Sequence, residues 1–141
     1  MTDDMTLAKE LLIRDRNTLV VCKNGKVYIS KDRGIRPLID LIESKEDLRG
    51  AVAADKVVGK AAALLYALMG VKAVCADTLG ESAVKVFEKH SIGYHYRTLT
   101  ESIINRQKTG LCPMEQTVLD IDDPKAALSA LKQKVEEMRN G

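Results

Sequence analysis

Side chains able to do chemistry are concentrated between Asn105 and Glu115. These eleven residues include an amide, two cations, a thiol and a carboxylate. The guanidinium fork of Arg106 suits a phosphate or a carboxylate, and Asn105 beside it can bind an amide or a hydroxyl. We interpret Asn105 and Arg106 as candidate ligand contacts. The alternative for Asn105 is an asparagine whose side chain stabilises a turn.

The end of this segment, Cys112-Pro113-Met114-Glu115, is typical of the first turn of a helix. Proline fits there because its missing N–H would be unpaired anyway, and a carboxylate complements the helix dipole. A helix N-terminus also favours the thiolate form of a cysteine, so Cys112 is a candidate nucleophile and Glu115 a candidate acid or base. The competing interpretations are a capping or structural Cys112 and a surface Glu115 that only complements the dipole. The only histidines that could serve as a base are His90 and His95.

A second unusual segment lies near the start of a helix that we predict over residues 55–69. Helical spacing would place Lys56, Gly59 and Lys60 on one face. Two lysines there oppose the positive end of the helix dipole, and a glycine inside a helix costs about 1 kcal/mol relative to alanine. An anionic ligand or a carboxylate partner would explain the lysines, and a close backbone approach would explain the glycine. Solvated lysines and a simple packing contact are the alternative interpretation.

The elements that position these residues follow from hydrophobic spacing and turn signals. The dipeptide Asn24-Gly25 predicts a hairpin between strands at 18–22 and 27–29. Asp123 and Pro124 open a final helix whose apolar stripe should include Ala127, Leu128, Leu131, Val135 and Met138. Other strands are predicted at 71–76 and 94–99. Further helices are predicted near the N-terminus, with Leu7 to Leu12 on its apolar face, and at 35–43, 81–90, 100–104 and 113–120.

Alternation of helix and strand after residue 55 predicts parallel pairing, and the leading hairpin predicts an antiparallel edge. A length of 141 residues fits one α/β domain spanning 1–141. The net charge of +2 and the few aromatic residues argue against nucleic acid as a partner. The acidic start and the lack of a long apolar run predict no signal peptide, no membrane span and a cytoplasmic location. Three scattered cysteines and two histidines do not match a disulfide framework or a zinc site.

Two segments carry a family resemblance. Asp55-Lys56-Val57-Val58-Gly59-Lys60-Ala61-Ala62-Ala63 and the later Asn105-Arg106 with Cys112-Pro113-Met114-Glu115, at this separation, resemble an uncharacterised bacterial family designated only as a domain of unknown function. The resemblance covers nearly the whole chain. It implies a cytidine-deaminase-like fold, which is a three-layer α/β/α sandwich with a mixed sheet led by a β-hairpin.

The zinc chemistry of nucleoside deaminases does not carry over with this resemblance. Those enzymes begin the helix corresponding to 55–69 with histidine or cysteine, then alanine and glutamate, and they use a metal-bound water. Here Ala54-Asp55-Lys56 stands near that point. The proline–cysteine–x–x–cysteine expected at the next helix is replaced by residues 78–83, Thr-Leu-Gly-Glu-Ser-Ala. We therefore expect no metal and no cofactor.

The resemblance does imply a hollow where two helix starts converge at one end of the sheet. Lys56 and Lys60 would face a phosphate there, Asp55 would hold a hydroxyl or pair with a lysine, and the loop ending at Glu115 would fold over it. The leading hypothesis is a zinc-free module that binds a small anionic ligand, nucleotide-like or nucleotide-derived, such as ADP-ribose. One alternative is a metal-independent enzyme that uses Asp55, Lys56, Cys112 and Glu115 on a nucleotide-like substrate. The other is a non-catalytic interaction protein with a vestigial pocket. Homo-oligomers are compatible with all three.

Overall fold

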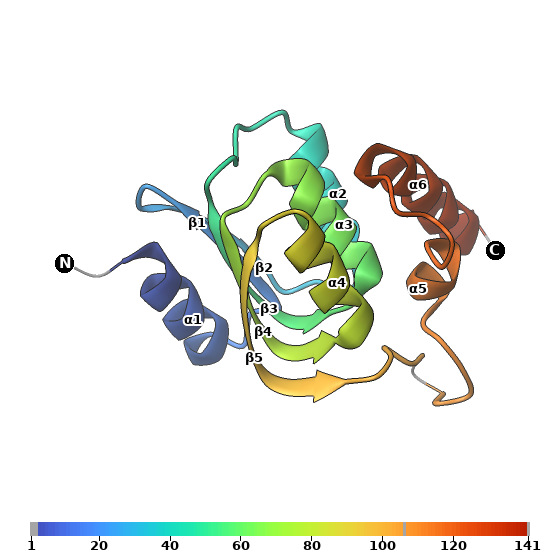
Figure 1. The fold of residues 1–141 in the computed structure, drawn as a ribbon. Helices are drawn as coiled ribbons and strands as arrows, with labels where there is room; N and C mark the ends of the chain where they lie inside the picture. The colour runs from blue at the N-terminus through green and yellow to red at the C-terminus, as the bar shows by residue number, and fades with distance from the viewer. Residues whose placement is uncertain (1–2, 106, 141) are drawn as a thin grey trace.

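The protein is built on a mixed five-stranded β-sheet, seen in a computed structural model that describes residues 3–105 and 107–140 (Figure 1). Its strand order is β2-β1-β3-β4-β5. β1 pairs antiparallel with both β2 and β3, whereas β3–β4 and β4–β5 are parallel. The predicted combination of an antiparallel hairpin edge and parallel later strands is confirmed. The strands are β1 (Leu19–Lys23), β2 (Lys26–Ser30), β3 (Val52–Val58), β4 (Ala73–Gly80) and β5 (Gly93–Thr100).

The hairpin forms where the sequence predicts it. Asn24 and Gly25 have φ angles of 51° and 82°, as a tight turn with two left-handed residues requires. The carboxylate of Asp4 accepts hydrogen bonds from both turn N–H groups, at 2.9 Å from Asn24 N and 3.1 Å from Gly25 N. Local turn chemistry and a helix-borne carboxylate therefore fix this edge of the sheet.

Helices cover both faces of the sheet (Figure 1). α1 packs on one face against β1 and β3, and α3 and α4 lie on the other face with α2 beside them. α5 and α6 pack on the outer side of α3, which adds helices beyond the predicted three-layer α/β/α sandwich. The helices are α1 (Asp4–Arg14), α2 (Arg36–Glu43), α3 (Lys60–Met69), α4 (Glu81–Lys89), α5 (Pro113–Thr117) and α6 (Pro124–Asn140).

Alternation along the strands divides the core between these two faces. Val20 and Cys22 pack with α1, whereas Leu19 and Val21 pack on the side of α2 and α3. The larger cluster is centred on α3, whose Tyr66 is fully buried. This cluster packs α3 against the sheet and so positions its N-terminus.

The predicted helix over 55–69 is wrong in its first turns. Residues 52–58 form β3, Gly59 is an extended residue (φ −105°, ψ −168°), and α3 begins at Lys60. β3 pairs with β1 on one side and β4 on the other, and these ladders determine the local structure. Lys56, Gly59 and Lys60 therefore do not share a helical face.

The predicted short helix from Thr100 to Ile104 is also wrong. Thr100 ends β5, and Ile104 forms an isolated antiparallel bridge with Leu111. The backbone N–H of Cys112 donates to Ile103 O at 3.0 Å, so this segment bonds to residues later in the chain. A helix would need those carbonyl groups for its own hydrogen bonds.

The C-terminal elements follow the prediction with two changes. Asp123 caps α6 by accepting from Ala126 N at 2.9 Å, and Ala127 and Leu131 are fully buried. However, the predicted stripe ends early because Met138 is 52% exposed, and α5 ends at Thr117 rather than near Asp120. Across the described residues, no helix combines the length and apolar character needed to cross a membrane.

Candidate functional site

Two helix N-termini meet at the carboxyl ends of the parallel strands. β3 leads through Gly59 into α3, and β4 leads through Gly80 into α4. A Cβ atom placed on Gly80 would lie 3.7 Å from Gly59 Cα and 3.6 Å from Ile103 Cγ1. The two helix starts are thus in direct contact, as the resemblance implied, and the segment after β5 lies against them.

The N-terminus of α3 binds a carboxylate from the same chain. Glu115 on α5 accepts from Lys60 N through Oε1 and from Ala61 N through Oε2, both at 2.8 Å. The first N–H groups of a helix have no partner within the helix, and a negative charge there also complements the dipole. Glu115 is only 8% exposed. The expectation of a surface Glu115 that complements its own helix is wrong, because it complements α3.

Gly59 is required by the closeness of that carboxylate. A Cβ atom at this position would collide with the carboxylate oxygens and carbon of Glu115. The backbone at Gly59 is extended, a conformation open to any residue, so space and not φ excludes a side chain. The close approach inferred as one explanation for this glycine is therefore present. We call the N–H groups of Lys60 and Ala61, together with Gly59, the α3 amide site.

The ammonium group of Lys60 is engaged within the protein. Its Nζ donates to Leu119 O at 3.1 Å and lies 3.0 Å from Asp122 Oδ1. The hydrogen bond and charge from Lys60 hold the pKa of the Asp122 carboxyl below its ordinary value. The side chain of Lys60 is 15% exposed. Of the explanations offered for this lysine, a carboxylate partner is the one that the geometry provides.

Asp55 lies on β3 and faces the core. The hydroxyl group of Tyr66 donates to its Oδ2 at 2.6 Å. The residue as a whole is half-buried, but its carboxyl group is withdrawn from water, and this burial raises its pKa to about 7. Burial and the neighbouring Asp55 also raise the pKa of Tyr66 well above its ordinary value. This pair could not be predicted from the sequence, because Asp55 lies on β3 and Tyr66 on α3.

Lys56 is separated from the α3 amide site. Its backbone N–H donates to Thr18 O at 3.1 Å. Among the described residues, no hydrogen bond or ion pair joins the Lys56 ammonium group to Asp55, Lys60 or Glu115. Asp55 bonds to Tyr66 and Lys60 to Asp122, so Asp55, Lys56 and Lys60 share no common partner.

The side chain of Asn105 stabilises a turn. Its Nδ2 donates to Thr109 Oγ1 and its Oδ1 accepts from Thr109 N, both at 3.0 Å. Backbone bonds from Asn105 N to Gly110 O at 2.9 Å and from Lys108 N to Asn105 O at 3.1 Å complete the turn. These hydrogen bonds agree with the alternative in which the Asn105 side chain stabilises a turn. Arg106 lies outside the described residues.

Cys112 immediately precedes α5. Its backbone has φ −52° and ψ 137°, and its side chain makes no capping hydrogen bond to that helix. The residue is half-buried. Cys112 and Glu115 are the two candidate residues at this helix start. Glu115 bonds to the α3 amide site, whereas the Cys112 side chain makes no capping hydrogen bond.

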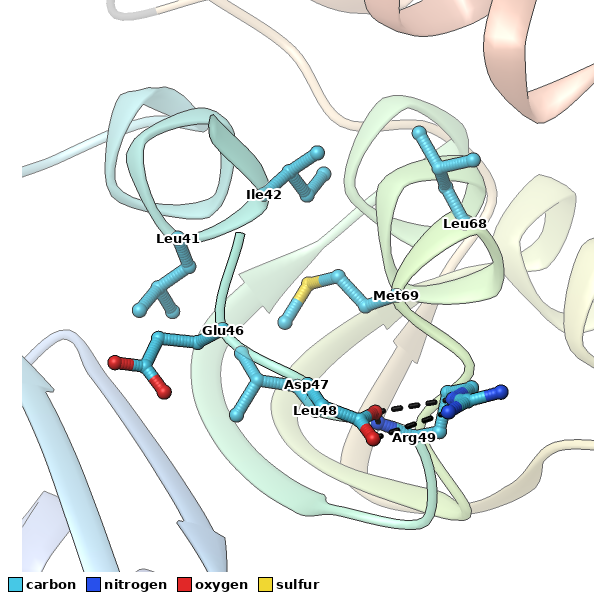
Figure 2. A pocket seen from close by; sticks show the side chains of 8 residues that line it. All are labelled: Leu41, Ile42, Glu46, Asp47, Leu48, Arg49, Leu68 and Met69. Atoms are coloured by element: carbon cyan, nitrogen blue, oxygen red, sulfur yellow. Dashed lines mark hydrogen bonds and ion pairs between the residues drawn. The ribbon is translucent and has the colours of Figure 1, made fainter. Parts of the chain in front are cut away.

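Two cavities lie away from this region. One, of about 230 Å³, lies between the ends of α2 and α3 and the loop where Arg49 donates to Asp47 at 3.0 and 3.1 Å (Figure 2). The other, of about 300 Å³, lies between the hairpin and α2 and is lined by Tyr28, Asp32 and Pro37 among others. None of the described ligand candidates lines either cavity. Within residues 3–105 and 107–140, no three His, Cys, Asp or Glu side chains gather as a metal site would require.

Strand order, the leading hairpin and the adjoining helix starts define a mixed α/β protein built on a five-stranded sheet. The chain belongs to the family described as a domain of unknown function, DUF1893 (TM1506), whose sequence profile matches residues 7–135. The family predicted from the sequence motifs is thereby confirmed.

Solved structures similar to this chain include a DUF1893 family protein, TM1506, from Thermotoga maritima. The identity is 24%, the TM-score is 0.87, and the match covers 95% of this chain and 91% of that one. A diaminohydroxyphosphoribosylaminopyrimidine deaminase/5-amino-6-(5-phosphoribosylamino)uracil reductase from Thermotoga maritima gives 21% identity and a TM-score of 0.43, over 86% of this chain and 45% of that one. A search of curated proteins gives no match.

Proposed function

We propose that this protein is a zinc-free, non-catalytic module that binds the anionic group of a small nucleotide or nucleotide-derived ligand, such as ADP-ribose. The ligand anion would bind at the α3 amide site in exchange for the Glu115 carboxylate. The observation that carries this proposal is the pair of 2.8 Å hydrogen bonds from Lys60 N and Ala61 N to Glu115. They support a site with the donors and the polarity that an oxyanion needs.

A phosphate oxygen can accept the same two N–H groups that the carboxylate accepts. Exchange of one anion for another leaves the helix dipole compensated. Lys60 lies beside the site and could turn from Asp122 toward a bound phosphate, because Asp122 is 75% exposed and water can replace it as a partner of the lysine. The ligand would extend along the segment that follows β5.

Glu115 competes with any such ligand. A group tethered within the same chain acts at an effective concentration of millimolar order or above. The wild-type protein would therefore bind a free anion weakly, and removal of the carboxylate would strengthen binding.

A non-catalytic interaction protein is the second candidate function. It is favoured by the fact that Glu115 satisfies the α3 amide site and Ile103 lies against Gly80, so the chain itself occupies the place where a pocket was expected. In that case no small anion binds there. The metal-independent enzyme is less well supported because Asp55 and Glu115 are both held in internal hydrogen bonds.

Thermal unfolding in the presence of phosphate, ADP-ribose or an uncharged nucleoside tests the proposal at matched ionic strength. Glu115→Ala should unfold at a lower temperature than wild type without ligand, and phosphate or ADP-ribose should restore stability in a saturable manner. Glu101→Ala is the matched control, because Glu101 is an exposed carboxylate on the segment after β5. An absence of anion-dependent stabilisation in both wild type and Glu115→Ala would favour the interaction protein instead.

A further inference from the structure

The strand β5 is an open edge of the sheet. It pairs with β4 on one side, and among the described residues no strand pairs with it on the other (Figure 1). Six of its eight residues are exposed. Roughly half of the backbone N–H and C=O groups of an edge strand point outward, where another extended chain can accept and donate hydrogen bonds. This edge is therefore a ready template for strand addition.

The opposite edge of the same sheet is protected in a way that β5 is not. β2 has only five residues, begins with Lys26 and is followed by Lys31. The ammonium group of Lys26 lies 3.8 Å from Glu46 Oε2 and over the Tyr28 ring. Short length and edge lysines are the usual means of preventing strand addition. β5 is longer and contains neither lysine nor proline.

Apolar side chains accompany the open backbone of β5. Tyr96 is 47% exposed and Leu99 is 41% exposed, and Ile104 just beyond the strand is 52% exposed. The single permanent charge on the strand is Arg97, which lies 3.8 Å from Asp77 on β4. An exposed strand with this composition favours a partner that supplies a strand of similar character.

We propose that β5 is the interface at which a second copy of this chain binds, with the two β5 strands antiparallel about a two-fold axis. The pairing would join two five-stranded sheets into one continuous sheet. A two-fold axis at Arg97 would set two guanidinium groups opposite each other, which is unfavourable. An axis at Tyr96 sets two tyrosine rings opposite each other instead, and aromatic pairs of this kind stabilise a sheet. Of these two registers, the axis at Tyr96 is the favoured one.

The same arrangement brings a helix from each copy into the interface. α4 packs over β4 and β5, and strands in a sheet are about 4.8 Å apart. In a continuous sheet the two α4 helices would thus lie roughly two strand spacings apart, within the 8–10 Å at which helices pack. The exposed residues of α4 include both acids (Glu81, Glu88) and bases (Lys85, Lys89), so antiparallel helices do not oppose a single sign of charge. Strands and helices together provide a larger contact than an edge alone.

Sedimentation or light scattering of the full chain across a dilution series tests this interface. Wild type should form a dimer of about 31 kDa, twice the chain mass of 15.5 kDa, and dissociate on dilution. Tyr96→Lys would place two ammonium groups at the axis and should leave a 15.5 kDa monomer. Ile29→Lys is the matched control, because Ile29 is similarly exposed on the other edge strand and its substitution should leave the dimer intact.

Thr98→Lys provides a second variant on β5 if Tyr96→Lys does not fold, and it should also reduce dimerisation. Backbone amides of β5 in wild type should exchange with deuterium more slowly at high protein concentration than at low concentration. A monomeric wild type at every concentration, or a dimer that persists in a folded β5 variant, would overturn the proposal. This result is independent of ligand binding at the α3 amide site, because neither measurement uses a ligand.

Discussion

Replacement of Glu115 by alanine should destabilise the protein by about 3 kcal/mol. The substitution removes two 2.8 Å hydrogen bonds to a charged acceptor, each of which contributes about 1.5 kcal/mol or more in proteins. It also removes the negative charge that complements the α3 dipole. The side chain is buried, so water can replace these interactions only in part. Loss of a helix cap alone costs about 1 kcal/mol. A larger loss of stability in Glu115→Ala would reflect the second hydrogen bond to α3 and the burial of the Glu115 side chain.

Urea unfolding at equilibrium measures this change as a lower midpoint with an unchanged slope. Glu115→Gln should lose less stability than Glu115→Ala, because one carbonyl oxygen can still accept from α3 while the charge is lost. Glu101→Ala, at an exposed site, should stay within about 0.5 kcal/mol of wild type. A Glu115→Ala variant as stable as the Glu101→Ala control would refute the reasoning, since the two hydrogen bonds would then contribute nothing measurable.

Three further changes test the surroundings of the site. Gly59→Ala should destabilise the folded chain by about 2 kcal/mol, because the added methyl group collides with the Glu115 carboxylate. In a Glu115→Ala background the same substitution should cost much less. Urea midpoints of the wild type, the two single variants and the double variant give the coupling energy between the two positions. Burial raises the pKa of Asp55 to about 7, so this carboxyl binds its proton more tightly in the folded chain than in the unfolded one. Its contribution to the free energy of unfolding is complete below about pH 4 and is lost as pH rises to about 7, at up to 1.4 kcal/mol per pH unit. Unfolding of Asp55→Asn against wild type should show this slope only in wild type, and parallel curves for the two proteins would contradict it. Lys60→Ala should cost below about 1 kcal/mol, because its carboxylate partner is largely exposed, yet it should speed hydrogen exchange over residues 113–122 more than Lys125→Ala does.

Local chemistry explains which elements could be predicted from the sequence. The hairpin depends on Asn24 and Gly25, whose preference for left-handed conformations acts within the turn itself. The start of α6 depends on Asp123, whose carboxylate accepts a hydrogen bond from the backbone N–H of Ala126, three residues later in the chain. Such signals are contained in a few neighbouring residues. They can therefore be read without knowing the rest of the fold.

The boundary between β3 and α3 could not be predicted in the same way. Residues from Asp55 to Val58 adopt a strand because β4 pairs along this segment and β1 pairs with Asp55, and this pairing overrides the helical spacing of the alanines that follow. The predicted helix from Thr100 to Ile104 is wrong for a related reason, since the hydrogen-bond partners of this segment are Leu111 and Cys112. In both cases hydrogen bonds to distant residues determine the conformation.

Two contacts near the α3 amide site were among the explanations offered from the sequence, although Gly59 precedes α3 and does not lie inside it. A carboxylate partner was one explanation offered for Lys60 and a close backbone approach one explanation for Gly59, and both contacts are present. The identity of the partner was not predictable, because Glu115 lies 55 residues from Lys60 in the sequence and no local pattern links them. Asp55 and Tyr66 form a buried pair for which the sequence provides no spacing rule.

Backbone amide chemical shifts of Lys60 and Ala61 test most directly the claim that Glu115 occupies an anion site. Phosphate or ADP-ribose would be titrated into wild type and Glu115→Ala at constant ionic strength. The two amides should shift saturably in Glu115→Ala, at ligand concentrations well below those needed in wild type. Unchanged shifts at both amides throughout the titration of Glu115→Ala would contradict the account and leave Glu115 as an internal helix cap alone.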